Sequence, residues 1–298
     1  MLRKKLIVIL GPTASGKSAL AVKLAKKFNG EIISADSRQV YRNMDIGTGK
    51  VTKKEMAGIP HYLLDVVSAK RRFSVAQYQK LSFQVISRIL KRGKIPILCG
   101  GSPFYVYSVV EGWSFPKLKP DWGLRKKLEK ESPKELLEIL KRLDKKRAKS
   151  IEKKNKRRLI RAIEICKKLA KVPKLKKEKK FNCLLIGIRK SKTELRKLIE
   201  RRLLKRLKKG MIAEVKKLRK SGVSFKRLEE FGLEYRFVAL YLQKKINHKD
   251  MVEKLKKEIE KFSKRQMTWF KKDKRIHWTP PTHYPYKYAE KLVKSFLR

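Results

Sequence analysis

Short apolar runs alternate with helix-like patterns over the first hundred residues of the chain. Residues 5–10, 31–34 and 95–99 form short apolar runs that contain β-branched side chains, and they predict buried strands. Between them, residues 18–28 and 74–90 place apolar side chains at helical spacing, and Ser74 is a suitable N-cap for the second helix. Strands that alternate with helices in this way indicate a parallel α/β sheet.

The pattern changes near residue 115. Residues 116–175 show no strand pattern and are helical and very basic, whereas residues 181–188 predict one more buried strand. We therefore expect an α/β core made of residues 1–115 and 176–298, an all-helical insertion at 116–175, and a helical C-terminal region. Two shorter strand candidates are residues 61–66 and 276–278. The helices expected after the last long strand span residues 194–208, 212–220, 234–244 and 249–270.

The charge of the chain indicates a polyanionic partner. Lys and Arg number 82 and Asp and Glu number 27, so the formal net charge is +55. Such a chain repels itself unless it meets polyanions or salt, and nucleic acid is the natural candidate because binding releases counterions from phosphates. An alternative origin of the lysine excess is genome composition or thermal adaptation.

Composition also excludes several classes of protein. A hydrophobic fraction of 41% excludes wholesale disorder. No apolar run approaches the roughly 20 residues that span a bilayer, and the first run is too short for a signal peptide. The three cysteines, Cys99, Cys166 and Cys183, fit neither a disulfide framework nor a zinc site, so we expect a cytoplasmic protein.

A glycine-rich loop between the first strand and the first helix fits the phosphate-binding pattern G-x-x-x-x-G-K-[ST]. Its residues are Gly11, Pro12, Thr13, Ala14, Ser15, Gly16, Lys17 and Ser18. The glycines let the backbone N–H groups point inward as an anion nest, and the helix N-terminus adds a favourable dipole. Lys17 supplies a positive charge to phosphate, and the Ser18 hydroxyl is a candidate Mg²⁺ ligand. We therefore expect a P-loop NTPase-like core that binds a di- or triphosphate.

The carboxylate that usually accompanies this loop is missing from its usual place. P-loop NTPases hold Mg²⁺ with an Asp at the end of a second apolar strand, but the run at 95–99 continues into Gly100-Gly101-Ser102. The nearby acid at a strand end is Asp36, which is a candidate Mg²⁺ ligand, a catalytic base or a simple turn residue. The bound phosphate compound therefore need not be ATP.

Further motifs carry a specific resemblance. Together with the phosphate loop, Asp36-Ser37-Arg38-Gln39-Val40-Tyr41 resembles the tRNA dimethylallyltransferase family. The following segments resemble that family in the same order: Met44-Asp45-Ile46-Gly47-Thr48-Gly49-Lys50, Gly58-Ile59-Pro60-His61, Gly100-Gly101-Ser102-Pro103-Phe104-Tyr105, Arg157-Arg158-Leu159-Ile160-Arg161-Ala162-Ile163-Glu164 and Lys264-Arg265-Gln266-Met267-Thr268-Trp269-Phe270. The resemblance runs from about residue 6 to residue 278.

The resemblance implies an activity. Members of the family transfer a dimethylallyl group from dimethylallyl diphosphate to N6 of adenosine 37 in tRNA, next to the anticodon, and release diphosphate. It implies that the phosphate loop, with Lys17, Ser18 and Mg²⁺, holds the diphosphate and that Arg202 adds a second cationic contact. It also implies a catalytic base in Asp36 and a hydroxyl in Ser102 that bonds the target base or the diphosphate.

The same resemblance implies a contact set for the tRNA anticodon stem-loop. Its members are Asp36, Ser37, Arg38, Gln39, Ser102, Arg125, Arg157, Arg158, Arg161, Arg265 and Gln266. We expect the helical insertion to grip the RNA and the protein to act as a monomer without an obligate protein partner. Trp269 and Phe270 are expected to serve in core or hinge packing rather than in base stacking.

Several positions depart from the family pattern. Leu204 stands where Asp is common, Arg38 stands where Met is common, and the acidic segment Glu229–Glu234 replaces a less charged one. These departures leave the diphosphate site intact and bear on the tRNA contacts. The alternatives to a prenyltransferase are a P-loop kinase for a small molecule or nucleoside and an RNA-binding protein that keeps a nucleotide switch.

Overall fold

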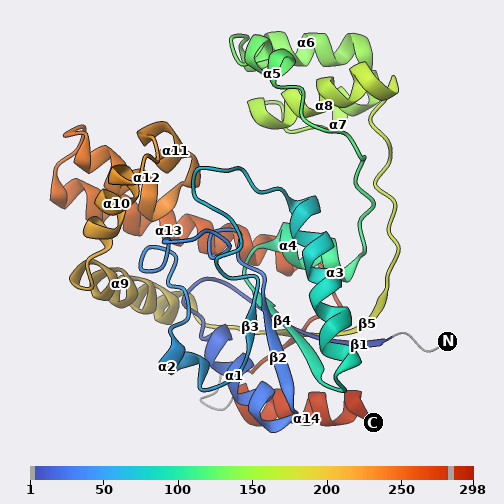
Figure 1. Ribbon diagram of the computed structural model, residues 1–298, viewed down its shortest axis with the longest axis vertical. Helices are drawn as coiled ribbons and strands as arrows, with labels where there is room; N and C mark the ends of the chain where they lie inside the picture. Colours follow the sequence, from blue (N-terminus) through green and yellow to red (C-terminus); the bar gives the residue numbers. More distant parts are fainter. Residues whose placement is uncertain (1–3, 281–284) are drawn as a thin grey trace. The chain divides into compact units, whose positions relative to one another are not determined.

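The computed structural model describes residues 4–280 and 285–298 and divides into two compact units (Figure 1). The first unit comprises Met1–Gly112 and Lys179–Arg298, and the second comprises Trp113–Glu178. The helical insertion expected at 116–175 falls within the second unit. Whether that unit grips tRNA stays a prediction.

The first unit is built on a six-stranded parallel sheet of strand order β3-β2-β4-β1-β5-β6. Its strands are β1 (Lys4–Leu10), β2 (Gly30–Ser34), β3 (His61–Tyr62), β4 (Ile95–Gly100), β5 (Phe181–Gly187) and β6 (His277–Trp278). The third strand is shorter than the expected 61–66 because Leu63 and Asp65 have φ angles of +62° and +57°, which an extended strand does not accommodate.

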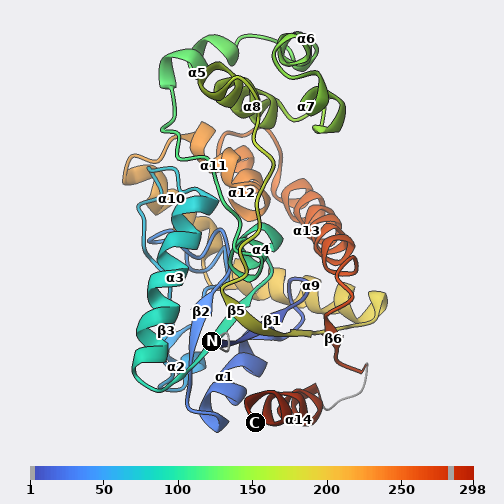
Figure 2. The same cartoon turned by 90° about the vertical axis from the view of Figure 1, so that its right-hand side faces the viewer.

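Helices cover both faces of this sheet. On one face, α1 (Lys17–Lys27) and α14 (Pro285–Leu297) share a core with inward side chains such as Ile7 and Ile186 (Figure 2). On the other, α3 (Val75–Lys91) contacts β2 and β4 and packs against α4 (Pro103–Val110). Continuous burial of β1 from Leu6 to Leu10 is what a strand covered on both faces requires.

Helix boundaries follow local capping signals. Ser74 caps α3 as expected, and it forms a capping box with Gln77. The remaining helices of the first unit are α2 (Lys53–Met56), α9 (Lys192–Lys208), α10 (Met211–Lys220), α11 (Phe225–Phe231), α12 (Leu233–Leu242) and α13 (His248–Phe270). No helix was predicted at the positions of α2, α4, α11 and α14.

The second unit is a four-helix cluster with a core of its own. It contains α5 (Trp122–Leu128), α6 (Pro133–Leu143), α7 (Lys145–Ser150) and α8 (Lys156–Leu169). Leu136 and Leu140 on α6 pack with Leu159 and Ile163 on α8, and all four side chains are fully buried. In residues 4–280 and 285–298, no helix is long and apolar enough to cross a membrane.

Candidate active site

The phosphate loop lies at the carboxyl end of β1 and leads directly into α1. Gly11 has a φ of +145°, and a Cβ atom there would lie 2.9 Å from the Ile188 carbonyl oxygen, so a side chain does not fit. Gly16 precedes α1 with a φ of +90° and has no side chain to cap the helix. The first N–H groups of α1 are therefore available to an anion.

A buried hydroxyl inside the loop supports anion binding. Ser15 Oγ has no hydrogen-bond partner among the described residues and points across the loop, where a Cβ on Gly11 would lie 3.4 Å from it. A buried polar atom without a partner is costly in a folded protein. A phosphate oxygen bound in the loop would supply the missing partner.

Lys17 is held in the loop without a direct carboxylate partner among the residues that the structure describes. Its Nζ donates a hydrogen bond to the Pro12 carbonyl oxygen. Burial, together with the nearby Arg202, lowers the pKa of Lys17 to about 8, although Cys99 and Asp36 act in the opposite direction. Such a lysine gains stabilisation when a diphosphate binds beside it.

Two arginines from α9 complete the positive site. Burial and the neighbouring Arg206 lower the pKa of Arg202 to about 10, although Glu234 and Asp36 act in the opposite direction. Arg206, one turn further along, pairs with the buried Glu234 at 2.6 Å. A Cβ on Gly49 would lie 2.1 Å from Arg206 and 2.3 Å from Arg202, so glycine is required where the loop crosses these two guanidinium groups.

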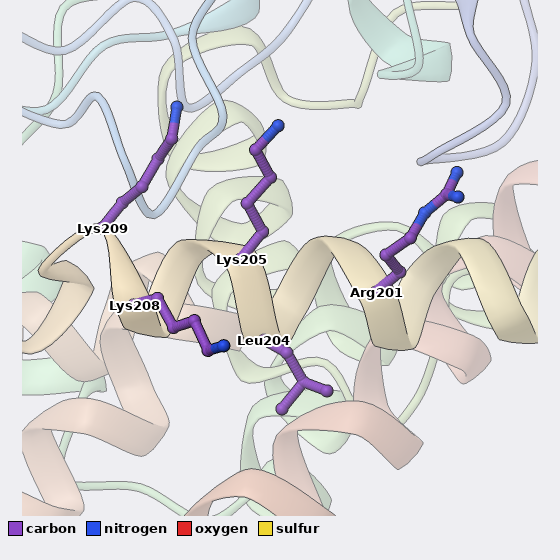
Figure 3. Close-up of a pocket in the computed structure, with 5 residues that line it drawn as sticks. All are labelled: Arg201, Leu204, Lys205, Lys208 and Lys209. Atoms are coloured by element: carbon purple, nitrogen blue, oxygen red, sulfur yellow. The ribbon is translucent and has the colours of Figure 1, made fainter.

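The exposed side chains of α9 form a separate surface (Figure 3). A surface pocket there is lined by Arg201, Leu204, Lys205, Lys208 and Lys209. Figure 3 shows Arg201, Lys205 and Lys209 on one side of the helix and Leu204 on the opposite side. Leu204 is 47% exposed, so the replacement of the usual Asp changes surface charge and leaves the core unaltered.

Asp36 and Ser102 lie just beyond the carboxyl ends of β2 and β4, and Ser102 is hydrogen-bonded to both chain neighbours of Asp36, Ala35 and Ser37. Both hydrogen bonds that Asp36 accepts within the described residues use Oδ1, from Arg38 N at 2.8 Å and Gln39 N at 3.4 Å. Ser102 Oγ accepts from Ser37 N at 3.0 Å and donates to Ser37 Oγ at 3.3 Å. The hydrogen bonds that hold the turn use only Oδ1 of Asp36, so Oδ2 can serve in catalysis.

Electrostatics place this carboxylate in the same site as the cations. Asp36 raises the pKa of both Lys17 and Arg202, against the larger effect of burial. The structure therefore brings together the phosphate loop, Arg202, Asp36 and Ser102, which are far apart in the sequence.

Arg38 and Gln39, which we expected to contact tRNA, form hydrogen bonds with other residues of the protein. Arg38 Nε donates to the Phe231 carbonyl oxygen at 2.7 Å, and burial lowers its pKa. Gln39 accepts from Ser34 Oγ at 3.2 Å and donates to the Gly49 carbonyl oxygen at 3.3 Å. Both residues fix the loop that carries Asp36.

Gln266 lies beneath the phosphate loop rather than on the surface. Its Oε1 accepts from Thr13 N at 2.8 Å, and its Nε2 donates to the Gly101 carbonyl oxygen at 2.6 Å. The side chain is only 3% exposed. We expected a tRNA contact here, and the structure instead places Gln266 between the phosphate loop and the turn that carries Ser102.

Glu214 on α10 holds the loop that precedes Gly49, and the sequence analysis missed it. Its carboxylate accepts the backbone N–H groups of Asp45 at 2.8 Å, Ile46 at 2.6 Å and Gly47 at 3.0 Å. It also accepts the Tyr235 hydroxyl at 2.7 Å. The three backbone partners lie 167 to 169 residues before Glu214, so no local pattern indicated this link.

In the second unit, two of the expected tRNA contacts surround a buried acid. Arg125 donates to both oxygens of Glu164, at 2.9 and 2.7 Å, and Arg161 also pairs with this carboxylate. Burial pushes the pKa of Glu164 up, but hydrogen bonds from Arg125, the Asp121 amide and Arg161 hold it at about 2. Arg157 and Arg158 are exposed, as is Arg265 on α13.

The protein groups that fit a magnesium ion are few. No cluster of three or more His, Cys, Asp or Glu side chains able to hold a metal occurs in the described part of the chain. The Ser18 hydroxyl is exposed at the start of α1, next to Lys17. This donor set fits an ion whose other ligands are diphosphate oxygens and water.

Comparisons with known proteins identify the relationship. The sequence profile of the IPP transferase family matches residues 39–273. A tRNA dimethylallyltransferase of Halothermothrix orenii is 39% identical, over 98% of this chain and 93% of its own. One from Acetivibrio thermocellus is 40% identical, over 97% and 95%. The chain belongs to the tRNA dimethylallyltransferase family.

Solved structures agree with this assignment. The tRNA isopentenylpyrophosphate transferase of Bacillus halodurans is 34% identical, with a TM-score of 0.75 over 99% of this chain and 96% of its own. A eukaryotic dimethylallyltransferase acting on tRNA is 26% identical, with a TM-score of 0.84 over 99% and 79%. The α/β fold with a P-loop NTPase-like core and the prenyltransferase class expected from the sequence are confirmed.

Proposed function

We propose that this chain transfers a dimethylallyl group from dimethylallyl diphosphate to N6 of adenosine 37 in tRNA. The N6–C1 bond forms as the C1–O bond breaks, and the electron pair of the C1–O bond leaves with diphosphate. The proton lost from N6 passes to a base, so the products are N6-(dimethylallyl)adenosine and diphosphate. The observation that carries this proposal is the convergence of the phosphate loop, Arg202, Asp36 and Ser102.

The positive end of the site stabilises the leaving group. Departure of an allylic diphosphate leaves a delocalised cation, so the transition state needs charge stabilisation mainly on the leaving oxygens. Lys17, Arg202 and the N–H groups at the start of α1 supply it, and Ser15 Oγ gains its partner there. A bound Mg²⁺, held by Ser18, would neutralise further charge on the diphosphate.

The other end of the site activates the nucleophile. Adenine N6 is a poor nucleophile, and a carboxylate within reach accelerates its attack by accepting the proton. The use of Oδ1 to hold the turn supports Asp36 Oδ2 as this base. Ser102 orients Ser37 and presents its own hydroxyl to the base. The target adenosine must leave its stack to reach these groups.

The binding of tRNA rests on charge and on the second unit. A net charge of +55 favours a polyanion, and exposed Arg157 and Arg158 fit contacts to phosphates. Arg125 of α5 then pairs with Glu164 of α8 and holds the two helices together, and Arg161 pairs with the same carboxylate from within α8. A monomer that acts in the cytoplasm, where the reduced state of its three free cysteines is maintained, fits this role.

The experiment that tests the proposal is a transfer assay. Purified protein, Mg²⁺ and unmodified tRNA with adenosines at positions 36–38 are incubated with labelled dimethylallyl diphosphate, and nucleosides are analysed by mass spectrometry. We expect N6-(dimethylallyl)adenosine at position 37. Absence of transfer together with ATP-dependent phosphorylation of a nucleoside or small molecule would favour the P-loop kinase and contradict the proposal.

A further inference from the structure

Two aromatic side chains form an exposed pair on the first unit. Phe104 on α4 and Trp269 on α13 have ring centroids 5.1 Å apart, with planes tilted by 57°. Each is 41% exposed, whereas the adjacent Tyr105 and Phe270 are buried. Trp269 and Phe270 were expected to serve in core or hinge packing; Phe270 lies in the core and Trp269 does not, because consecutive residues of a helix point about 100° apart.

Each ring lies close in sequence to a residue of the candidate active site. Phe104 lies two residues after Ser102, in the first turn of α4. Trp269 lies three residues after Gln266, whose amide binds both the phosphate loop and Gly101. Phe104 is therefore in the helix that begins at Ser102, and Trp269 is in the helix whose Gln266 is hydrogen-bonded to the phosphate loop.

Two exposed cationic residues lie close to Trp269 along the chain. Arg265 precedes Trp269 by one turn on the same face of α13, and Lys272 follows it by three residues. Both side chains are exposed. Exposed aromatic rings among cations are the combination that proteins use for unpaired nucleotides, since bases stack on the rings and phosphates pair with the charges.

We propose that Phe104 and Trp269 form a stacking platform for the unpaired nucleobase next to the target adenosine. The inference rests on the proposed function and adds to it a specificity-determining contact. When the target adenosine leaves the anticodon-loop stack, its neighbour loses a stacking partner. The aromatic pair replaces that partner, which lowers the cost of extruding the adenosine and places N6 near Asp36.

The test combines changes in the protein with changes in the RNA. The variants Trp269→Leu and Phe104→Leu are assayed for transfer to an anticodon stem-loop RNA at limiting RNA concentration. Tyr288→Leu, an exposed aromatic on α14 that is 36% exposed, is the matched control. We expect kcat/KM for RNA to fall roughly tenfold in each platform variant, in line with the loss of one base–aromatic stack. Binding of the prenyl diphosphate and the rate with Tyr288→Leu stay at the wild-type level.

The RNA half of the test separates stacking from a merely structural role. Two further stem-loops carry an abasic site on the 5′ or the 3′ side of the target adenosine. We expect one of these two RNAs to be a poor substrate of the wild type. Trp269→Leu should use that RNA as well as the wild type does. An equal loss by the variant on all three RNAs, or no loss on any, would overturn the proposal. Failure of the wild type on every RNA would instead contradict the proposed function.

Discussion

Replacement of Lys17 is expected to make the protein more stable while it removes diphosphate binding. Burial lowers the pKa of Lys17 from 10.5 to about 8. A shift of this size corresponds to a cost of about 3 kcal/mol for keeping the protonated side chain in the folded protein at pH 7. Lys17→Met removes this cost and loses one hydrogen bond to Pro12, worth about 1 kcal/mol. We expect a net gain of about 2 kcal/mol in the free energy of unfolding at pH 7.

The sign of the pH dependence follows from proton binding. Between about 8 and 10.5 the unfolded chain keeps the Lys17 proton and the folded protein releases it, so wild-type stability rises with pH through this window. The burial cost in the wild type therefore falls to about 1 kcal/mol or less at pH 10. Between pH 7 and pH 10 the stability advantage of Lys17→Met therefore decreases by as much as the burial cost in the wild type decreases.

The assay is urea unfolding of wild type and variant at pH 7 and pH 10. Lys26→Met, an exposed site on the same helix, is the control and is expected to show no pH-dependent difference from wild type. A parallel titration with isopentenyl diphosphate, which lacks the allylic bond, is expected to show affinity falling about tenfold per pH unit above 8 in the wild type and in Lys26→Met, both of which keep Lys17. A Lys17→Met variant that is no more stable than wild type at pH 7, or equally more stable at both pH values, refutes the reasoning.

Three further changes test the supporting contacts. Glu214→Ala leaves three backbone N–H groups without their acceptor, so we expect a loss of about 2 kcal/mol in unfolding free energy and a raised KM for the prenyl diphosphate, measured by denaturation and steady-state kinetics. The pKa of Glu164 is about 2 in the folded protein, against an ordinary value of 4.5. Its contribution to the free energy of unfolding is therefore present above pH 4.5 and is lost as the pH falls toward 2. Glu164→Gln should abolish this acid sensitivity in melts of the full chain. Gln266→Met keeps the side-chain volume but not the link to Thr13 and Gly101, so calorimetry should show weaker binding of the prenyl diphosphate, whereas unchanged affinity would count against a positioning role.

Local patterns predicted most of the sheet and the long helices. The strands β1, β2, β4 and β5 are short apolar runs that are largely buried in the sheet. Ser74 carries a local capping signal for α3. Both kinds of pattern can be recognised without knowledge of distant parts of the chain. The same kind of signal was present for α14, where Tyr286, Ala289 and Val293 repeat at helical spacing, but it was overlooked.

Local sequence patterns could not predict the contacts that support the site. Thr13 and Gln266 are 253 residues apart, and Asp45 and Glu214 are 169 apart, so only the folded chain shows that these polar side chains are buried as links. Arg38 and Gln39 were placed in the correct loop by motif, but their partners at Phe231 and Gly49 depend on tertiary packing. A motif thus locates a loop, and the fold decides which of its side chains point inward.

The central claim is that Asp36 accepts the N6 proton while the phosphate loop holds the diphosphate. The most direct measurement is the single-turnover rate of dimethylallyl transfer to tRNA by Asp36→Asn, with the affinities for tRNA and for the prenyl diphosphate measured on the same preparation. We predict a rate at least about a hundredfold below wild type, since a general base contributes that much, and affinities within about threefold of wild type. A transfer rate equal to that of the wild type would contradict the account.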